Sequence, residues 1–256
     1  VQDIFPNETA QFADVVLAGA SFAEKEGTFT NTERRVQRVR AALPLPGEAR
    51  EDWRVLTELG KRMGAGWNYA GAAEVFDEMA RLTPSYGGMS HARLEAGGLQ
   101  WPCPAPDHPG TPILHTQKFS RGVGAFAPID YRPPAEQPDA EYPLVLSTGR
   151  VLFHWHGGTM TRRSPGLDSL APTAEVEIHP EDAERYRVKP DQPIRVRSRR
   201  GQVVASARVT RRSPPGTIFM TFHYAEVAVN LLTGGAVDPI AKIPEYKVTA
   251  VCLEPV

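Results

Sequence analysis

Two segments in the first third of the chain place apolar residues at helical spacing. In residues 51–63 these are Trp53, Val55, Leu56, Leu59 and Met63, and in residues 72–82 they are Val75, Phe76, Met79 and Leu82. Spacings of three and four residues put side chains on one face of a helix. The pattern therefore predicts two amphipathic helices with core-facing apolar sides, the first ending at Gly64 and the second before Pro84.

Short apolar runs predict strands on either side of a proline-rich stretch. Residues 1–5 and 14–18 suit short buried strands of a parallel α/β sheet, and residues 27–39 suit a loop that leads into a strand. Residues 101–142 contain recurrent prolines and no helical period. This stretch is therefore expected to be an extended crossing segment, with a domain boundary near residue 140.

The remainder of the chain is rich in predicted strands. They fall at residues 143–148, 175–179, 216–223 and 246–253, with two more in residues 193–210 around a turn at Gly201. Residues 180–186 begin with Pro and have acids in the first turn, which is typical of a short helix. Several short strands with one short helix predict a small barrel.

Composition narrows the class of protein. The chain has 256 residues, enough for one or two domains, and a formal net charge of −1, which does not indicate a nucleic-acid-binding face. No apolar run approaches the ~18–20 residues of a membrane span. The two cysteines, Cys103 and Cys252, cannot form a four-cysteine site alone and are expected to be buried, in a reducing compartment. The start, without Met and in a strand-like run, suggests part of a longer protein, or else a processed N-terminus.

The most informative chemistry lies in residues 149–164. In order, this stretch holds two histidines, a glycine pair, two threonines and two arginines: His154, His156, Gly157, Gly158, Thr159, Thr161, Arg162 and Arg163. Glycine allows backbone N–H groups to approach a phosphate, and arginine matches phosphate geometry with two parallel donors. These residues predict a polyanionic heteroaromatic ligand, such as a dinucleotide or a pterin dinucleotide.

Alternatives stay open for several of these residues. His154 and His156 favour ligand contact over a metal pair or a purely structural role. Arg34 and Arg35 suit either a nucleotide contact or a surface turn. Asn230 could contact a heterocycle edge through its donor and acceptor, or cap a helix.

The other arginines and the motif searches carry less information about the ligand. Arg197, Arg199 and Arg200 favour a solvated hairpin face. Phosphate-loop, dinucleotide-fingerprint and Ser-His-Asp motifs are missing, so the residues indicate binding more than catalysis.

Longer stretches carry a family resemblance over nearly the whole chain. They are residues 1–5, 20–37, 100–104, 148–164 and 238–247. With them the chain resembles the C-terminal part of the catalytic (alpha) subunit of molybdenum- or tungsten-dependent formate dehydrogenases. That family belongs to the molybdopterin oxidoreductases of the dimethyl-sulfoxide-reductase type. Ala18-Gly19 departs from the family's usual Pro-Ala, which affects loop shape rather than chemistry.

The resemblance implies a fold and a set of cofactor contacts. Residues 1–139 would end an α/β domain that holds the pterin dinucleotide and add the proline-rich crossing segment. Residues 140–256 would form a six-stranded double-psi β-barrel. The contacts carried over are Gly149, Arg150, His154, His156, Thr159, Met160 and Thr161, then, less closely matched, Asn230, Tyr246 and Lys247, and, at the guanine end, Asp3, Glu26 and Thr28.

The resemblance also implies cofactors and partners. The complete enzyme would bind bis-molybdopterin guanine dinucleotide with molybdenum or tungsten, oxidise formate to CO2 and pass electrons through iron–sulfur clusters to NAD. The metal-ligating cysteine or selenocysteine and the 4Fe-4S motif lie upstream in the family, and neither Cys103 nor Cys252 matches them. No catalytic or metal-ligating residue is therefore assigned here. The expected partners are the upstream part of the same subunit and iron–sulfur/flavin NAD-reducing subunits, in the cytoplasm.

Two further interpretations compete with this one. One is a non-catalytic scaffold resembling the large iron–sulfur subunit of respiratory complex I, although a scaffold need not keep the polar donors of residues 149–161. The other is part of a different pterin enzyme, such as a nitrate reductase.

Overall fold

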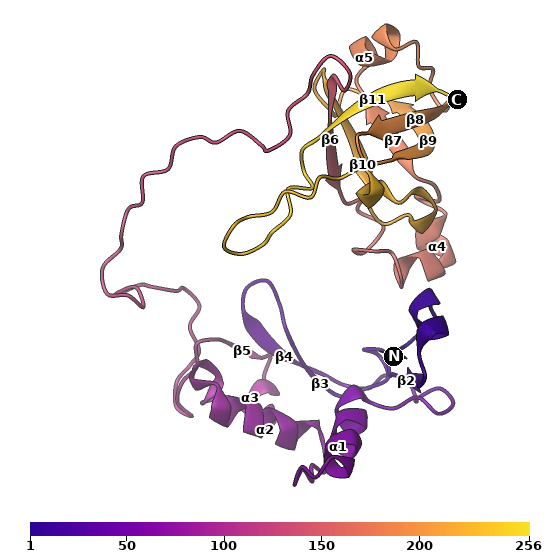
Figure 1. Cartoon of the computed structure of the whole chain (residues 1–256). Helices are drawn as coiled ribbons and strands as arrows, with labels where there is room; N and C mark the ends of the chain where they lie inside the picture. Colours follow the sequence, from indigo (N-terminus) through magenta and orange to yellow (C-terminus); the bar gives the residue numbers. More distant parts are fainter. The chain divides into compact units, whose positions relative to one another are not determined.

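The structure, a computed structural model, describes all residues 1–256 and divides into two compact units, Val1–Phe126 and Ala127–Val256 (Figure 1). Each unit is described by itself. No helix in either unit has the length and apolar character needed to cross a membrane. The predicted assignment of residues 1–139 and 140–256 to two domains stays a prediction.

The first unit begins with two short strands, β1 (Gln2–Asp3) and β2 (Leu17–Ala18), which pair in parallel. A 3-10 turn, Glu8–Phe12, lies between them. The parallel pairing was expected from the apolar runs, but the expected burial is wrong. Val15 and Val16 are 62% and 54% exposed, because no layer of this unit covers that side of the two-residue ladder.

Three strands make a small antiparallel sheet in the order β3 (Gly27–Thr30), β4 (Arg35–Val39) and β5 (Leu99–Gln100). The expectation of a loop before β4 is wrong for residues 27–30. The side chain of Asn31 accepts hydrogen bonds from the backbone of Glu33 (3.1 Å) and Arg35 (3.0 Å). This local capping closes a tight turn, so the preceding residues pair as a strand.

The two predicted helices form at the expected places, as α1 (Asp52–Arg62) and α2 (Ala72–Leu82), followed by the short α3 (His91–Leu94). A 3-10 turn, Pro84–Tyr86, precedes α3. Phe76 of α2 packs into the core of this unit, as expected.

The other apolar helix positions are more exposed than expected. The exposed fractions are 56% for Leu56, 51% for Leu59, 79% for Met63 and 76% for Leu82. α1 instead buries Thr57 and Gly60. A Cβ on Gly60 would lie 2.2 Å from the ring of Trp67, so this tryptophan packs against the glycine face.

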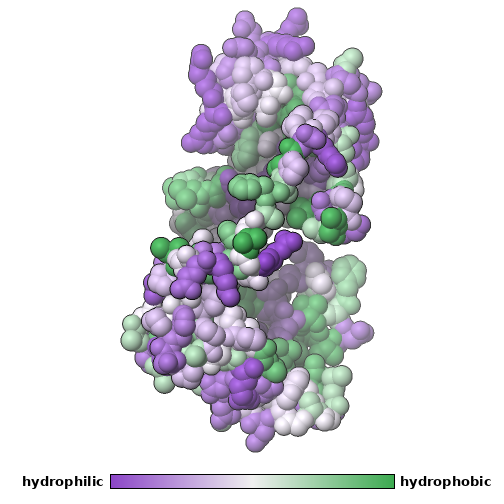
Figure 2. Space-filling view, turned by 90° about the vertical axis from the view of Figure 1, so that its left-hand side faces the viewer, coloured by the Kyte–Doolittle hydropathy of each residue, from purple (hydrophilic) through white to green (hydrophobic).

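Residues 101–142 hold no helix or strand beyond an isolated bridge, as the proline pattern predicted. Val123 and Phe126 are 87% and 105% exposed. Figure 2 shows one face of the chain, on which apolar and polar surface are mixed. Cys103, in contrast, is fully buried, and Cys252 is 9% exposed, so both cysteines are buried as expected.

The second unit is a closed six-stranded barrel, the fold class that the sequence led us to expect. Its strands are β6 (Leu144–Gly149), β7 (Glu175–Ile178), β8 (Pro193–Ser198), β9 (Gln202–Val209), β10 (Thr217–Thr221) and β11 (Thr249–Pro255). They close in the order β10-β6-β11-β8-β9-β7, with the β10–β6 and β7–β9 pairs parallel and the others antiparallel. Each strand lies where the alternating pattern predicted one.

Alternate residues of the strands fill the barrel, because successive side chains of a strand point to opposite faces. The fully buried side chains include Leu144, Leu146, Val176, Ile178, Ile194, Val196, Ile218 and Met220. Burying each such side chain contributes about 1.5–3 kcal/mol. Two short helices flank the strands, α4 (Pro165–Asp168) before β7 and α5 (Pro180–Arg185) after it.

Candidate functional site

The strand directions bring three connecting segments to one end of the barrel: β6 to β7, β8 to β9 and β10 to β11. β6 and β10 run parallel, and both are antiparallel to a neighbour, β11 or β7. The ends of β6 and β10 therefore lie beside the starts of β7 and β11. β8 is also antiparallel to β11, so the turn after β8 belongs to the same end. All predicted site residues of this unit, from Gly149 to Lys247, lie in these connections or where they join a strand.

Gly149 ends β6 beneath an aromatic ring. A Cβ at this position would lie 2.4 Å from Cε2 of Phe219 on β10. Only glycine leaves that space, so the end of β6 packs closely against its parallel neighbour. The chain then leaves the barrel at Arg150, whose guanidinium lies 5.4 Å from the ring of Phe222.

His154 orders the loop that follows. It is 4% exposed, and its Nε2 lies 2.8 Å from the carbonyl oxygen of Ala171. That nitrogen must carry the proton, because a carbonyl only accepts. Nδ1 then accepts from the Thr161 hydroxyl at 3.2 Å, and the same oxygen accepts the Trp155 N–H at 3.1 Å. Both ring nitrogens are thus engaged within the chain, which favours a positioning role for His154 and Thr161; their assignment as cofactor contacts stays a prediction.

His156, Thr159 and Met160 are exposed on the same loop. Backbone conformations with positive φ shape it, at 46° for His156 and 71° for Gly158. Gly158 N–H donates to the carbonyl of Trp155 at 2.8 Å and closes a tight turn. The loop therefore presents these three side chains outward.

A second cluster packs beneath this loop, from the segment after β10. The ring of His223 lies 4.6 Å from that of His154 and 3.8 Å from that of Tyr224. The Tyr224 hydroxyl donates to the carbonyl of Ala171 at 2.8 Å, the same oxygen that His154 uses. Burial, then the charges of His154 and Arg162, lower the pKa of His223 to about 4, so its ring is neutral at pH 7.

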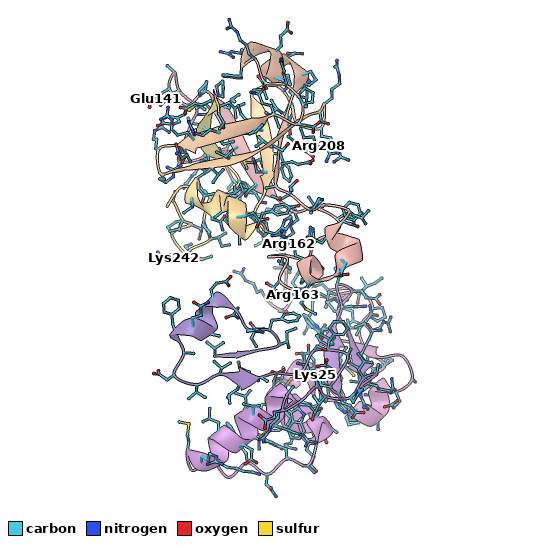
Figure 3. All side chains as sticks on the ribbon, turned by 90° about the vertical axis from the view of Figure 1, so that its right-hand side faces the viewer. Lys25, Glu141, Arg162, Arg163, Arg208 and Lys242 are labelled. Atoms are coloured by element: carbon cyan, nitrogen blue, oxygen red, sulfur yellow. The ribbon has the colours of Figure 1, made fainter.

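Arg162 and Arg163, labelled in Figure 3, are both engaged within the chain. Arg162 donates to Glu226 at 2.8 Å and to Asp168 at 3.4 Å, and Arg163 donates to the carbonyl of Thr159 at 2.6 Å. The sequence predicted a phosphate-binding role for both arginines. It gave no sign of Glu226 and Asp168, since only the folded chain places these acids beside Arg162.

Tyr246 and Lys247 reach the end of β6 from almost a hundred residues away. The Thr148 hydroxyl donates to the Tyr246 carbonyl at 2.7 Å, and Lys247 Nζ donates to the Thr148 carbonyl at 2.5 Å. The ammonium group of Lys247 and the backbone of Tyr246 therefore lie beside the end of β6. Thr148, which anchors both, was not among the predicted site residues, although it begins the stretch 148–164 that carries the resemblance.

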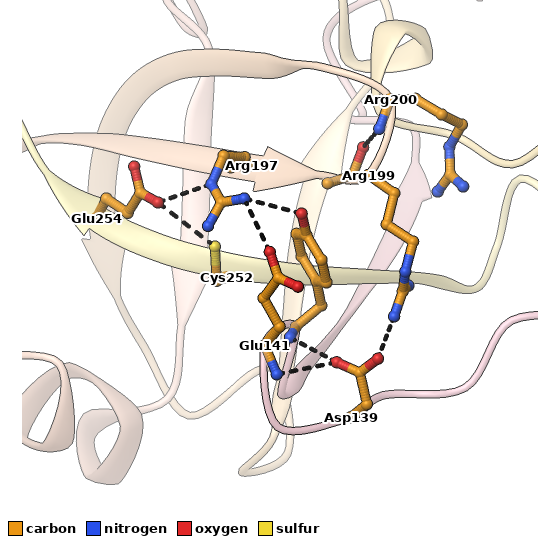
Figure 4. A network of polar contacts seen from close by, with 9 residues as sticks. Asp139, Glu141, Arg197, Arg199, Arg200, Cys252 and Glu254 are labelled. Atoms are coloured by element: carbon orange, nitrogen blue, oxygen red, sulfur yellow. Dashed lines mark hydrogen bonds and ion pairs between the residues drawn. The ribbon is translucent and has the colours of Figure 1, made fainter.

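Asn230 lies apart from that group at the same end of the barrel. It is exposed on the 3-10 turn Val229–Leu231, two residues before Leu232, whose carbonyl accepts from Arg200 Nε at 2.9 Å. This places Asn230 near the β8–β9 turn. Arg197, Arg199 and Arg200 around that turn are not simply solvated. Arg197 pairs with Glu254 and Arg199 with Asp139 (Figure 4), and Arg200 pairs with Glu136.

A cleft of about 710 Å³ adjoins the first part of the loop. Arg150 and the residues up to Phe153 line it, together with Phe219 and Tyr224. Two ion pairs lie on its wall: Arg208 of β9 with Glu175 of β7 at 2.9 Å, and Arg212, in the turn after β9, with Glu177 of β7 at 3.4 Å.

In the first unit, the structure brings together two of the three predicted residues. Glu26 and Thr28 line a cavity of about 330 Å³. Asp3 does not line it, and its carboxylate accepts from the Ile4 N–H at 2.6 Å and from Asn7 Nδ2 at 2.7 Å.

The walls of this cavity carry unsatisfied polar groups. His91 and Trp53 line it, and each has a buried ring nitrogen without a hydrogen-bond partner. Burial, then the charge of Arg38, lowers the pKa of His91. Arg34, in contrast, binds the carbonyls of Thr111 (3.0 Å) and Pro112 (2.9 Å), which matches a structural turn.

The donor set fits a polyanionic heteroaromatic group better than a bare metal ion. Arg150 and Lys247 supply cations, the backbone of Gly157 is exposed, and Nε2 of His223 is buried without a partner. No cluster of three or more His, Cys, Asp or Glu side chains in the chain could hold a metal ion. A metal at this site would therefore need ligands other than such a cluster.

Comparisons with known proteins agree with the geometry. Residues 144–250 match the family described as molydopterin dinucleotide binding domain, and residues 1–62 match the molybdopterin oxidoreductase family. The alpha subunit of F420-dependent formate dehydrogenase 1 from Methanococcus maripaludis is 52% identical over 99% of this chain. The catalytic subunit of assimilatory nitrate reductase from Bacillus subtilis is 38% identical over the same share. This chain spans 38% of the length of either relative.

A solved structure supports the fold. Acetylene hydratase from Pelobacter acetylenicus superposes with a TM-score of 0.66 and 18% sequence identity, over 96% of this chain and 38% of that one. At this identity the likeness concerns the fold alone.

Proposed function

This chain belongs to the molybdopterin oxidoreductases and contains a molybdopterin dinucleotide-binding domain, and we propose that it is the cofactor-holding C-terminal part of a formate dehydrogenase alpha subunit. The observation that carries the proposal is the convergence at one end of the barrel. There the loop after β6, the segment after β10 and the residues before β11 gather cationic, hydroxyl and imidazole donors. Such a donor set suits a ligand with several phosphates and a heterocycle.

The residues of this chain would hold and orient the group. Arg150 and Lys247 supply positive charge at the end of β6, and His156 and Thr159 supply exposed donors on the loop. Thr161 and His154 keep the loop in shape. Glu26, Thr28 and Asp3 remain the candidates for the guanine end.

The bound bis-molybdopterin guanine dinucleotide, with molybdenum or tungsten, would supply the redox chemistry that oxidises formate to CO2. Iron–sulfur clusters and the metal-ligating residue would come from the upstream part of the subunit. Electrons would leave through iron–sulfur/flavin subunits to NAD, in the cytoplasm. The relatives named F420-dependent make F420 the competing acceptor. An assay of formate oxidation with NAD and with F420 separately distinguishes the two.

A nitrate reductase is the second candidate, favoured by the 38% identity to the Bacillus subtilis enzyme. The full-length enzyme would then reduce nitrate and leave formate unchanged. Formate oxidation without nitrate reduction supports the first candidate, and the reverse result supports the second.

The direct test of the cofactor site is Arg150→Ala in the full-length subunit. Losing a charge-assisted hydrogen bond to a phosphate should weaken cofactor binding by about tenfold or more. The measurements are metal content and released guanine dinucleotide per subunit. Arg211→Ala, at an exposed arginine of the same unit, is the control and should retain the cofactor. Equal cofactor content in both variants would reject the assignment of Arg150.

A further inference from the structure

Arg162 connects three segments at the end of the barrel, although the resemblance does not assign it a cofactor contact. It follows the exposed part of the loop, in a 3-10 turn, Thr161–Arg163. Its guanidinium donates to Glu226 at 2.8 Å, after β10, and to Asp168 at 3.4 Å, in α4. The guanidinium carbon also lies 4.9 Å from the ring centre of Tyr224.

The backbone of Arg162 is tied to the tip of the loop as well. Its N–H donates to the carbonyl of Gly158 at 2.9 Å. A Cβ on Gly158 would lie 2.9 Å from Cγ of Arg162 and 3.3 Å from Cδ2 of His223. The glycine tip, the arginine stem and the histidine ring are therefore packed together without room for another carbon.

The contacts of Arg162 continue into the hydrogen bonds that shape the loop. Tyr224, over which its guanidinium lies, donates to the carbonyl of Ala171, and His154 donates to the same oxygen. His154 in turn holds Thr161, the residue before Arg162. The chain of contacts is thus closed, from Arg162 through Tyr224, Ala171, His154 and Thr161 back to Arg162.

We propose that Arg162 is a positioning residue, whose guanidinium bridge to Glu226 and Asp168 fixes the loop conformation that presents His156, Thr159 and Met160. The bridge acts on the loop whatever the loop binds, and only its consequence for cofactor retention rests on the proposed function. Arginine suits this role because its planar group can donate to two carboxylates and stack on an aromatic ring at once.

Hydrogen exchange of the full chain tests the bridge without any cofactor. In Arg162→Gln, the protected amides of Trp155, Gly158 and Arg162 should exchange about tenfold faster than in the unchanged chain, because the loop opens locally. The barrel strands should keep their protection. Arg211→Gln removes the same charge from an exposed position and should leave the loop unchanged. Equal loop exchange in Arg162→Gln and Arg211→Gln overturns the proposal.

A second variant tests the bridge even if Arg162→Gln weakens the fold of the chain. Glu226→Gln removes the partner from the other segment, and the double variant Arg162→Gln/Glu226→Gln completes a cycle. Non-additive effects on loop exchange, with the double variant close to Arg162→Gln alone, support the bridge. Fully additive effects overturn it, because the two side chains would then act independently.

Cofactor content in the full-length subunit separates this inference from the proposed function. Faster loop exchange together with a several-fold loss of guanine dinucleotide in Arg162→Gln supports both. Faster exchange with unchanged cofactor in both Arg162→Gln and Arg150→Ala supports the bridge and rejects the loop as a cofactor site. Unchanged exchange with lost cofactor in Arg150→Ala alone rejects the bridge and keeps the cofactor site.

Discussion

At the scale of single residues, buried imidazoles dominate the chemistry of the barrel end. His154 is satisfied on both ring nitrogens, whereas Nε2 of the neighbouring His223 is buried without a partner. Burying a polar atom without a hydrogen-bond partner costs about 1–3 kcal/mol, so we expect this nitrogen to have a function that offsets the cost. Its low pKa keeps His223 neutral, and a neutral ring can pack between His154 and Tyr224 without adding a positive charge beside Arg162.

The stability of the chain should therefore fall in acid through His223. Its pKa is about 4 in the folded chain, against an ordinary value of 6.5, so the unfolded chain binds more protons between these pH values. The free energy of unfolding should fall by about 2 kcal/mol as pH drops from 6.5 towards 4. Urea unfolding at several pH values measures this loss. His223→Gln should flatten the dependence and His115→Gln, at an exposed histidine, should not; identical slopes in all three chains would contradict the account.

At the scale of elements, the end of β6 is set by its contact with β10. Gly149 packs directly beneath Phe219, and the next residue begins the loop. Thr148 anchors the segment before β11 through its hydroxyl and its carbonyl. The parallel β6–β10 pair therefore decides where the loop leaves the barrel and which distant residues stand beside it.

Gly149→Ala should disturb this junction. The added Cβ would lie 2.4 Å from the ring of Phe219, and displacing a packed ring costs about 1–3 kcal/mol. The midpoint of thermal unfolding should fall by several degrees, measured by circular dichroism. Gly166→Ala in α4 is the matched control, because nothing lies within 4 Å of its Cβ position. A Gly149→Ala chain as stable as Gly166→Ala would show that Phe219 moves aside at no cost.

At the scale of the whole molecule, ion pairs tie the end of the proline-rich stretch to the barrel. Glu136 pairs with Arg199 at 2.7 Å and with Arg200 at 2.6 Å. Asp139 also pairs with Arg199, as Figure 4 shows. These acids precede the boundary that the composition predicted near residue 140, yet they belong to the second compact unit.

Two shortened chains test where that unit begins. Residues 127–256 contain the whole barrel core and should unfold cooperatively. Residues 140–256 should also fold but unfold at a lower denaturant concentration, because the three ion pairs of Glu136 and Asp139 are lost. Chemical unfolding compares the two. Equal stability would favour the boundary near residue 140, and a disordered shorter chain would mean that residues 127–139 are indispensable.

The sequence by itself determined the elements. The six barrel strands, the two long helices and the glycine-rich loop follow from patterns that extend over a few residues, where backbone geometry alone sets the period. It also singled out His154 and His156 as chemically notable and, through resemblance, predicted Arg150 as a contact and the family of the chain.

Only the tertiary structure decided which surfaces and partners those residues meet. Leu59 and Met63 follow the helical pattern yet are exposed, because burial depends on what covers a face. Arg162 and Glu226, and Thr148 and Lys247, are 64 and 99 residues apart and meet only because the strands close into a barrel. Such long-range contacts arise from register and packing between strands, which no local pattern of residues encodes.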